Sequence, residues 1–263
     1  MILASSFDTN DIKMWQNRGF MYGDGVFETM RCVNQKVPLC TWHQQRLLQS
    51  LKYLKIEPPD MEFIKHIIKE QLSEPDAVLR LTVFRRQAER GYQPLSRHCD
   101  WLLSQYPFQQ KQRPLTLTIA KQRLSPQPLL KGMKHLNRLP QVLIARELND
   151  NDADDLLVLN QQDEVIETTC QNLLIIKDNQ VFTPDMQDCG VEGVALAWLK
   201  QHIIIKTQIL RLNDIKNADG IITANAVHGF RQVKTIETLG SFQLNHLIYD
   251  RISKLWQQQI NLI

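Results

Sequence analysis

The chain has 263 residues, of which 43% are hydrophobic and 22% are charged, so it is long enough for one large domain or two modest ones. Its 31 basic and 28 acidic residues give a net charge of +3 and are scattered along the chain. This balance argues against a nucleic-acid-binding stripe and against a membrane-seeking patch. We therefore expect a small-molecule partner, and neither nucleic acid nor a membrane.

Cysteine usage indicates a reducing compartment. The five cysteines are odd in number and never form a Cys-x-x-Cys pair, which argues against a disulfide framework and against a zinc site, so no metal is expected. The opening segment has no basic start, its apolar run is too short for a signal peptide, and no apolar stretch reaches the length of a membrane span. These features predict a cytoplasmic protein.

The first part of the chain is predicted to mix strands and helices. The expected elements are, in chain order, two strands around the Asn34-Gln35 turn in 25–40, helices in 41–56 and 61–72, and strands in 77–86 and 100–108. The Gln- and Pro-rich segment 106–114 lies between two strand-like runs and is the candidate linker. The predicted domains are a small N-terminal α/β domain at 1–107, a linker at 108–114 and a larger C-terminal domain at 115–263.

The second part of the chain follows the same pattern. The expected elements are a strand in 114–120, a helix beginning with Pro140, three or four short strands in 154–184, a helix in 191–203, a strand and loop in 220–233, and an amphipathic helix in 244–260. Proline suits a helix start because the missing amide donor costs little there. Clefts between two such mixed units commonly bind ligands.

Lys134, in the stretch GMKHLNRLPQVLIAREL at 132–148, is a candidate nucleophile. A lysine must be neutral to form an imine, whereas its reference pKa of roughly 10.4 keeps it charged in water. Burial lowers such a pKa by up to ~3–5 units, and Met133 and Leu136 offer an apolar setting. Lys131 and Arg138 are also near, so a solvated surface lysine is the alternative from the local sequence.

Three features could bind an anion or a cationic ring. Arg46 and His43 lie three residues apart on one face of a predicted helix, where an arginine can donate two hydrogen bonds to a phosphate. The Gly-containing helix start CGVEGVAL at 189–196 could offer amides to an anion. Glu167 ends a predicted strand and could pair with a cationic ring nitrogen. The alternatives are a solvated helix face, a helix start without a ligand and an exposed carboxylate.

Two arginines could bind a substrate that carries carboxylates. Arg80 is the charged residue of an otherwise apolar strand, and Arg90 follows ten residues later in an Arg-Gly-Tyr sequence. An edge strand with arginines pointing to water is the alternative. Upstream, Gly23 and Gly25 bracket Asp24 in YGDGVFETMR, which permits a close turn but matches neither a dinucleotide nor a Walker fingerprint. Asp24 is expected to accept hydrogen bonds from turn amides.

The order of these features along the chain resembles that of the fold-type IV pyridoxal-phosphate enzymes, which include branched-chain aminotransferases, D-amino-acid aminotransferases and aminodeoxychorismate lyases. The matching segments lie between residues 18 and 233 and are RGFMYGDGVFETMR, HQQRLLQS, GMKHLNRLPQVLIAREL, VIETTCQNLLI, FTP, GVEGVAL and IITANA. The resemblance implies an α+β fold of two domains, a small α/β sandwich and a larger pseudo-barrel domain that carries the catalytic lysine. It also implies a homodimer with pyridoxal 5'-phosphate as cofactor.

By the same resemblance, six residues would bind the cofactor. Lys134 would form the imine, and Glu167 would keep the pyridine nitrogen protonated so that the ring acts as an electron sink. The phosphate would be bound by Arg46 and by the amides of Val194, Ala195 and Ala226.

Within the family, the chain resembles the lyases more than the aminotransferases. Leu139 stands where branched-chain aminotransferases tend to have a tyrosine, and Asn225-Ala226 stands where they favour Gly-Thr-Ala. The implied reaction converts 4-amino-4-deoxychorismate to 4-aminobenzoate and pyruvate, a step toward folate, with Lys134 as the base and Thr29 as the acid. The candidates for the two substrate carboxylates are Arg80, Arg90, Tyr92 and Asn225. The alternatives are a D-amino-acid or branched-chain aminotransferase and a non-catalytic metabolite-binding protein.

Overall fold

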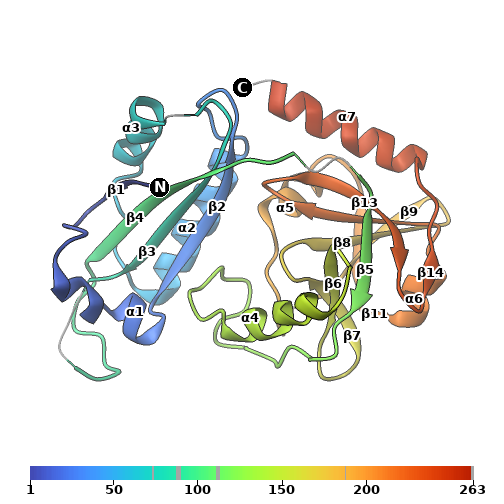
Figure 1. Cartoon of the computed structure of the whole chain (residues 1–263), viewed down its shortest axis with the longest axis horizontal. Helices are drawn as coiled ribbons and strands as arrows, with labels where there is room; N and C mark the ends of the chain where they lie inside the picture. The colour runs from blue at the N-terminus through green and yellow to red at the C-terminus, as the bar shows by residue number, and fades with distance from the viewer. Residues whose placement is uncertain (73, 87–89, 111–112, 187, 262–263) are drawn as a thin grey trace. The chain divides into compact units, whose positions relative to one another are not determined.

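The computed structural model describes residues 1–72, 74–86, 90–110, 113–186 and 188–261 (Figure 1). The chain divides into two compact units. The first comprises Met1–Gln109 and Met133–Asn137, and the second comprises Gln110–Gly132 and Arg138–Leu262. Within the described residues, no helix combines the length and the apolar character that crossing a membrane requires.

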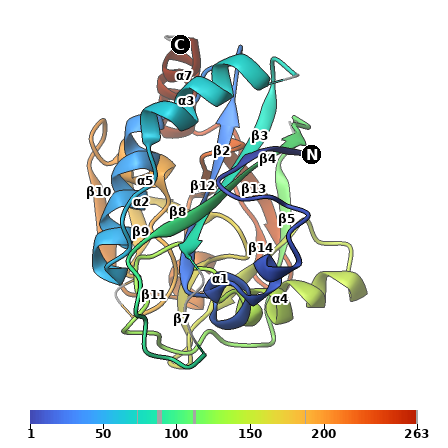
Figure 2. The same cartoon turned by 90° about the vertical axis from the view of Figure 1, so that its left-hand side faces the viewer.

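The first unit is built on a four-stranded antiparallel sheet with the strand order β1-β4-β3-β2. Its strands are β1 (Ile2–Ser5), β2 (Gly25–Cys32), β3 (Ala77–Arg85) and β4 (Cys99–Pro107), and its helices are η1 (Ile12–Gln16), α1 (Arg18–Tyr22), α2 (Cys40–Leu54) and α3 (Met61–Gln71). The helices α2 and α3 cover one face of the sheet, and their buried residues join those of the strands in one hydrophobic core (Figure 2).

The alternation of side chains along β2 decides which of its residues join that core. Val26, Met30 and Cys32 belong to the core beneath the helices. Because successive side chains of a strand point to opposite faces, Phe27 and Thr29 lie on the other face of the sheet. A single strand therefore carries packing residues on one side and candidate site residues on the other.

The helix α3 follows from a capping residue and an apolar period. The side chain of Asp60 accepts hydrogen bonds from the amides of Glu62 and Phe63, both at 3.0 Å, and so satisfies two amide groups at the helix start. Ile64 and Ile68 lie four residues apart and are buried against the sheet.

The described part of the second unit has ten strands in one sheet. The path through the sheet is β10-β9-β8-β12-β13-β5-β6-β7-β11, and β14 pairs with β13 outside this path. The strands are β5 (Leu115–Ile119), β6 (Asp155–Leu159), β7 (Glu164–Thr168), β8 (Asn172–Lys177), β9 (Gln180–Pro184), β10 (Ile205–Gln208), β11 (Leu210–Arg211), β12 (Gly220–Asn225), β13 (Gly229–Ile236) and β14 (Gly240–Ser241). The helices are α4 (Leu139–Ala145), η2 (Arg146–Asp150), α5 (Val194–Leu199), α6 (Leu212–Lys216) and α7 (Leu247–Asn261).

Three elements differ from those predicted from the sequence. One is the loop expected after the strand in 220–233, where β13 (Gly229–Ile236) forms a second strand. The second strand expected in 25–40 does not form, because β2 ends at Cys32, an isolated bridge joins Val33 to Lys36, and α2 begins at Cys40. Leu39 has a φ of 60°, so the backbone turns there instead of extending. The helix expected at 191–203 is shorter, since α5 covers only Val194–Leu199.

The segment around Lys134 belongs to the first unit, which also differs from the expected domains. The amide of Phe27 donates to the carbonyl of Lys134 at 2.9 Å, and the amide of Leu136 donates to the carbonyl of Gly25 at 3.0 Å. These bonds, with an antiparallel bridge between Val26 and His135, attach the segment to the start of β2. The lysine expected in the larger C-terminal domain therefore lies with the first unit. Local periodicity gives no sign of this pairing, because the partner strand is far away in the sequence.

Candidate functional site

Lys134 is held by backbone pairing and lies over an aromatic ring. Its neighbours Met133 and His135 are buried, and His135 forms an isolated antiparallel bridge with Val26. The Nζ atom of Lys134 lies 4.7 Å from the centroid of the Phe27 ring. The lysine is therefore a positioned side chain on a defined face of the first unit, and not the freely solvated lysine that the local sequence left open.

Thr29 and Arg80 occupy the same face of the sheet as Phe27. In the antiparallel register of β2 and β3, Thr29 is directly opposite Arg80, and Phe27 is directly opposite Thr82. The guanidinium of Arg80 lies 3.9 Å from the centroid of the Phe27 ring, and its Nε donates to the Thr82 hydroxyl at 3.4 Å. Burial lowers the pKa of Arg80 from its usual value. Two cationic groups, those of Lys134 and Arg80, thus lie near one phenyl ring, and Thr29 occupies the same face of the sheet.

The helix-covered face of the same sheet holds a buried ionic cluster of Glu28, His43 and Arg46. Glu28 and His43 are each 2% exposed. The Glu28 carboxylate accepts from Nε of Arg46 at 2.8 Å and from one of its Nη atoms at 2.5 Å, and its Oε2 lies 2.7 Å from Nδ1 of His43. Arg46 is therefore bound in a two-point pair, which fixes the plane of its guanidinium.

The cluster sets the charge of its members. Burial alone raises the pKa of Glu28, but the charge of Arg46 and the hydrogen bonds from His43 and Arg46 outweigh it and lower the pKa to about 2. Burial lowers the pKa of His43, with smaller contributions from the charges of Arg46 and Lys134, although Glu28 opposes the shift. At neutral pH the cluster is thus an ionised glutamate, a charged arginine and a neutral histidine whose Nδ1–H donates to Glu28. The Nε2 atom of His43 is buried and has no hydrogen-bond partner among the described residues.

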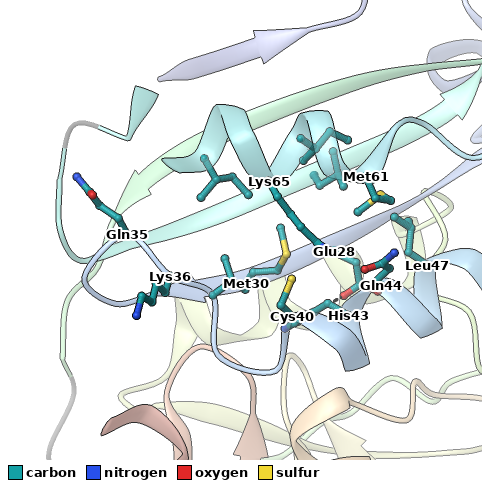
Figure 3. A pocket seen from close by; sticks show the side chains of 14 residues that line it. Glu28, Met30, Gln35, Lys36, Cys40, His43, Gln44, Leu47, Met61 and Lys65 are labelled. Atoms are coloured by element: carbon teal, nitrogen blue, oxygen red, sulfur yellow. Dashed lines mark hydrogen bonds and ion pairs between the residues drawn. The ribbon is translucent and has the colours of Figure 1, made fainter. Parts of the chain in front are cut away.

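A cavity of about 290 Å³ lies beside this cluster, lined by residues of β2, β3, α2, α3 and the connection between β2 and α2 (Figure 3). Its lining is mainly apolar, with Met30, Leu47 and Ile64 among the residues that belong to the hydrophobic core. Glu28 and His43 also line it, but their polar atoms have almost no accessible surface. The cavity therefore belongs to the packing of the first unit, and we assign no ligand to it.

In the second unit, Glu167 is a buried carboxylate on β7. It is 8% exposed, and its Oε2 accepts a hydrogen bond from the amide of Val191 at 3.2 Å. Gly190 has a φ of 89°, and a Cβ atom there would come within 2.8 Å of the Ile166 side chain, so glycine permits the close approach of this turn. Burial, and then the charge of Glu167, raise the pKa of the Cys189 thiol to about 11. The thiol next to Glu167 is therefore protonated at neutral pH.

Asn172 fixes the turn that leads into α5. Its side chain donates to the carbonyl of Val191 and accepts from the amide of Gly193, both at 2.8 Å. A Cβ atom at Gly193 would lie only 2.4 Å from Oδ1 of Asn172, so the contact requires glycine. The next two residues, Val194 and Ala195, start α5 and are buried.

Asn225 and Ala226 form the turn after β12. The side-chain oxygen of Asn225 accepts from the amides of Val227 at 3.1 Å and His228 at 2.7 Å, which stabilises the turn that contains Ala226. The side-chain amide of Asn225 donates to the carbonyl of Cys170 at 3.5 Å. Asn225 is thus tied to the turn that follows β7, the strand of Glu167.

Arg90 and Tyr92 lie on an exposed loop of the first unit, and Tyr92 is 88% exposed.

Asp24, which the sequence assigned to turn amides, instead accepts from the buried side chains of Arg18 and Arg85. The sequence reasoning also overlooked Glu28. The alternation of side chains along β2 could have identified it, because Glu28 is a charged residue at a position of the strand that faces the core.

The family description "Amino-transferase class IV" matches residues 25–236. An aminodeoxychorismate lyase of Vibrio harveyi is 30% identical over 232 residues, which cover 84% of this chain and 86% of the relative. A putative branched-chain-amino-acid aminotransferase of Methanocaldococcus jannaschii is 29% identical over 226 residues, with coverage of 80% and 78%.

A solved structure has the same arrangement of elements. The crystal structure of 4-amino-4-deoxychorismate lyase from Pseudomonas aeruginosa superimposes with a TM-score of 0.85 and 27% sequence identity, covering 97% of each chain. The match extends over both units, so the second unit as well as the first has its counterpart in that enzyme.

Proposed function

The chain belongs to the class IV aminotransferase family of pyridoxal-phosphate enzymes, and from this premise we propose that it is a lyase that converts 4-amino-4-deoxychorismate to 4-aminobenzoate and pyruvate. The fold-type IV class expected from the sequence is confirmed by the family match and by the likeness to the Pseudomonas aeruginosa enzyme. The observation that supports the lyase proposal is the face of the first unit on which Nζ of Lys134 lies 4.7 Å from the Phe27 ring centroid and Thr29 is directly opposite Arg80.

The residues of this chain fit the cofactor chemically. Pyridoxal phosphate needs an amine, a carboxylate for its ring nitrogen and cationic or amide donors for its phosphate. We assign Lys134, Glu167 and Arg46 to these three tasks, with phosphate donors also at the amides of Val194, Ala195 and Ala226. In the first unit, the two-point pair with Glu28 fixes the plane of the Arg46 guanidinium, and the Arg46 side chain is 14% exposed.

The residues of the first unit can divide the chemistry between them. When bound, pyridoxal phosphate supplies an electron sink. The Nζ atom of Lys134 removes the proton from the amine-bearing carbon of the substrate, and the Thr29 hydroxyl gives a proton to the oxygen of the departing enolpyruvyl group. Arg80, directly opposite Thr29, binds a carboxylate of the substrate. We assign the same task to Arg90 and Tyr92 of the first unit and to Asn225 of the second. The pairing of β2 with β3 supports this division, because it puts Thr29 directly opposite Arg80.

Incubation of the purified holoenzyme with 4-amino-4-deoxychorismate, in the absence of any amino acceptor, tests the proposal. We expect pyruvate and 4-aminobenzoate in equal amounts over many turnovers. The second candidate is a D-amino-acid or branched-chain aminotransferase, which the identity to the Methanocaldococcus jannaschii relative favours. Absence of both products, together with conversion of the cofactor to its amine form by an amino acid, would refute the lyase and support the aminotransferase.

We further propose a cytoplasmic homodimer that acts in folate synthesis. The support is the family resemblance and the absence of disulfide or metal-binding cysteine spacing from the sequence. Light scattering coupled to size-exclusion chromatography measures the mass, and a value near the 30.7 kDa of one chain would contradict the dimer.

A further inference from the structure

Asp24 is shared by two buried arginines. Its Oδ2 atom accepts from Nε of Arg18 and from Nε of Arg85, both at 2.9 Å. The two arginine side chains are each 4% exposed and the Asp24 side chain is 15% exposed. Two buried guanidinium groups cannot be balanced by a single carboxylate, so their remaining donors need other acceptors.

Arg18 uses its remaining donors on the loop after β3. Its two terminal nitrogens donate to the carbonyl of Gly91 at 2.8 Å and to the carbonyl of Tyr92 at 2.9 Å. The guanidinium also lies 4.8 Å from the centroid of the Tyr22 ring, and the Tyr22 hydroxyl accepts from the amide of Gly91 at 3.3 Å. One arginine therefore holds two consecutive peptide groups of the loop.

Arg85 anchors the opposite side of Asp24. It donates to the carbonyl of Leu54 at 2.6 Å, to that of Lys55 at 3.2 Å and to that of Ser96 at 2.7 Å. These acceptors lie at the end of α2 and on the segment that leads to β4. These hydrogen bonds hold Arg85 in place within the first unit. Because Asp24 accepts from both arginines, it connects Arg18 to Arg85.

The same turn that contains Asp24 also holds the segment of Lys134. The carbonyl of Gly23 accepts from the Asn137 side chain at 3.0 Å, and the carbonyl of Gly25 accepts from the amide of Leu136 at 3.0 Å. The turn at residues 23–25 is thus bonded to the segment of Lys134 through Asn137 and Leu136, and to the loop after β3 through Asp24 and Arg18. Tyr92 is 88% exposed, and its ring makes an edge-on contact with the Tyr22 ring at 5.6 Å between the centroids.

We infer that Arg18 and Asp24 are positioning residues, which hold the Arg90–Tyr92 loop at a fixed place on the first unit so that the loop can bind a carboxylate of the substrate. The inference rests on the proposed function, because that proposal assigns Arg90 and Tyr92 to the substrate. It adds a role for two residues to which the proposed function assigns no contact with substrate or cofactor. Loss of the Arg18 bonds should weaken substrate binding and leave the chemistry at Lys134 intact.

Arg18→Lys tests the inference, because lysine keeps the charge but cannot bind Asp24 and two carbonyls with a rigid planar group. In the holoenzyme we expect KM to rise about tenfold, with kcat and the absorbance band of the lysine-bound cofactor unchanged. Arg86→Lys is the matched control: Arg86 is next to Arg85, pairs with Asp100 at 3.1 Å and is half exposed. It should leave KM unchanged.

A double-mutant cycle shows whether Arg18 acts through the loop. If Arg90→Gln alone raises KM, Arg18→Lys added to it should raise KM no further, whereas independent effects would multiply. Multiplying effects, or a fall in kcat and cofactor binding without a change in KM, overturn the positioning role. Should Arg18→Lys fail to fold, Tyr22→Phe removes only the hydroxyl bond to Gly91 and should raise KM by a smaller factor in the same cycle.

Hydrogen exchange of the holoenzyme separates this inference from the proposed function. Amides at 91–93 should exchange faster in Arg18→Lys than in the wild type and in Arg86→Lys, whatever reaction the enzyme performs. If the exchange rates of these amides do not change, the positioning role of Arg18 is refuted, even if the lyase assay succeeds. If these amides exchange faster but the protein makes no 4-aminobenzoate, the lyase function is refuted and the positioning role of Arg18 stands. The double-mutant cycle is then run with the amino acid that converts the cofactor.

Discussion

Replacement of Glu28 by glutamine should reduce stability strongly at neutral pH. The folded-state pKa of Glu28 is about 2, against an ordinary value of 4.5, and a shift of one unit corresponds to about 1.4 kcal/mol, so the difference amounts to about 3 kcal/mol. Glutamine keeps the shape but removes the charge that pairs with Arg46. Removal of one partner from a buried ion pair costs about 3–5 kcal/mol in other proteins, which agrees with this figure.

The sign of the pH dependence follows from the direction of the shift. A carboxyl group whose pKa is depressed on folding contributes its full stabilisation above its unfolded pKa and loses it as the pH falls toward its folded pKa. For Glu28 the window is between about 4.5 and about 2. The stability difference between the wild type and Glu28→Gln should therefore be largest at pH 7 and shrink steadily below pH 4.5.

Urea unfolding, followed by tryptophan fluorescence at pH 7, 5, 4 and 3, measures this difference. Glu62→Gln is the matched control, because Glu62 is 81% exposed and pairs with Lys65 on the surface of α3. Its free energy of unfolding should change by less than about 0.5 kcal/mol. A difference below about 1 kcal/mol for Glu28→Gln at pH 7, or one that stays constant down to pH 3, would refute the reasoning.

Three further substitutions test the site. Lys134→Ala should abolish both turnover and the absorbance band of the lysine-bound cofactor, and retention of either contradicts its assignment. Thr29→Val should slow product formation at least tenfold while cofactor binding, read from the same band, stays unchanged; equal rates would remove Thr29 from the mechanism. Gly193→Ala should lower the free energy of unfolding by about 1–3 kcal/mol, because the new Cβ displaces the Asn172 oxygen, whereas Gly220→Ala, whose Cβ would meet only ordinary contacts, should lower it by less.

The sequence predicts local structure well where one period dominates. The apolar period of α3 and its Asp60 cap are visible in the sequence, and the alternation of β2 separates its two faces. Failures occur where the backbone pairs over a long sequence distance. The attachment of the Lys134 segment to β2 rests on backbone hydrogen bonds, which leave no mark on residue type, so the domain to which Lys134 belongs was not predictable from its neighbours.

The burial of charged residues in the candidate site was equally hard to predict from the sequence. From the local sequence, Arg46 and His43 indicated a solvated helix face more than a ligand site. Their burial follows from Glu28, which lies on another element and supplies the charge that permits both to enter the interior. A buried charge is predictable from the sequence only when its partner is identified at the same time, and the pairing of a strand with a helix sets that partner.

Two adjacent residues of β2, Glu28 and Thr29, face opposite sides of the sheet and have different surroundings. Glu28 faces α2 and holds Arg46, whereas Thr29 faces the side of the sheet on which Lys134 lies over Phe27. A shift of one residue in the pairing of β2 with β3 would exchange the two faces, placing the carboxylate beside Lys134 and the hydroxyl in the core. The core residues Val26 and Met30 oppose that shift because they would leave the hydrophobic core beneath the helices. The apolar packing under the helices therefore determines which polar residue faces the lysine.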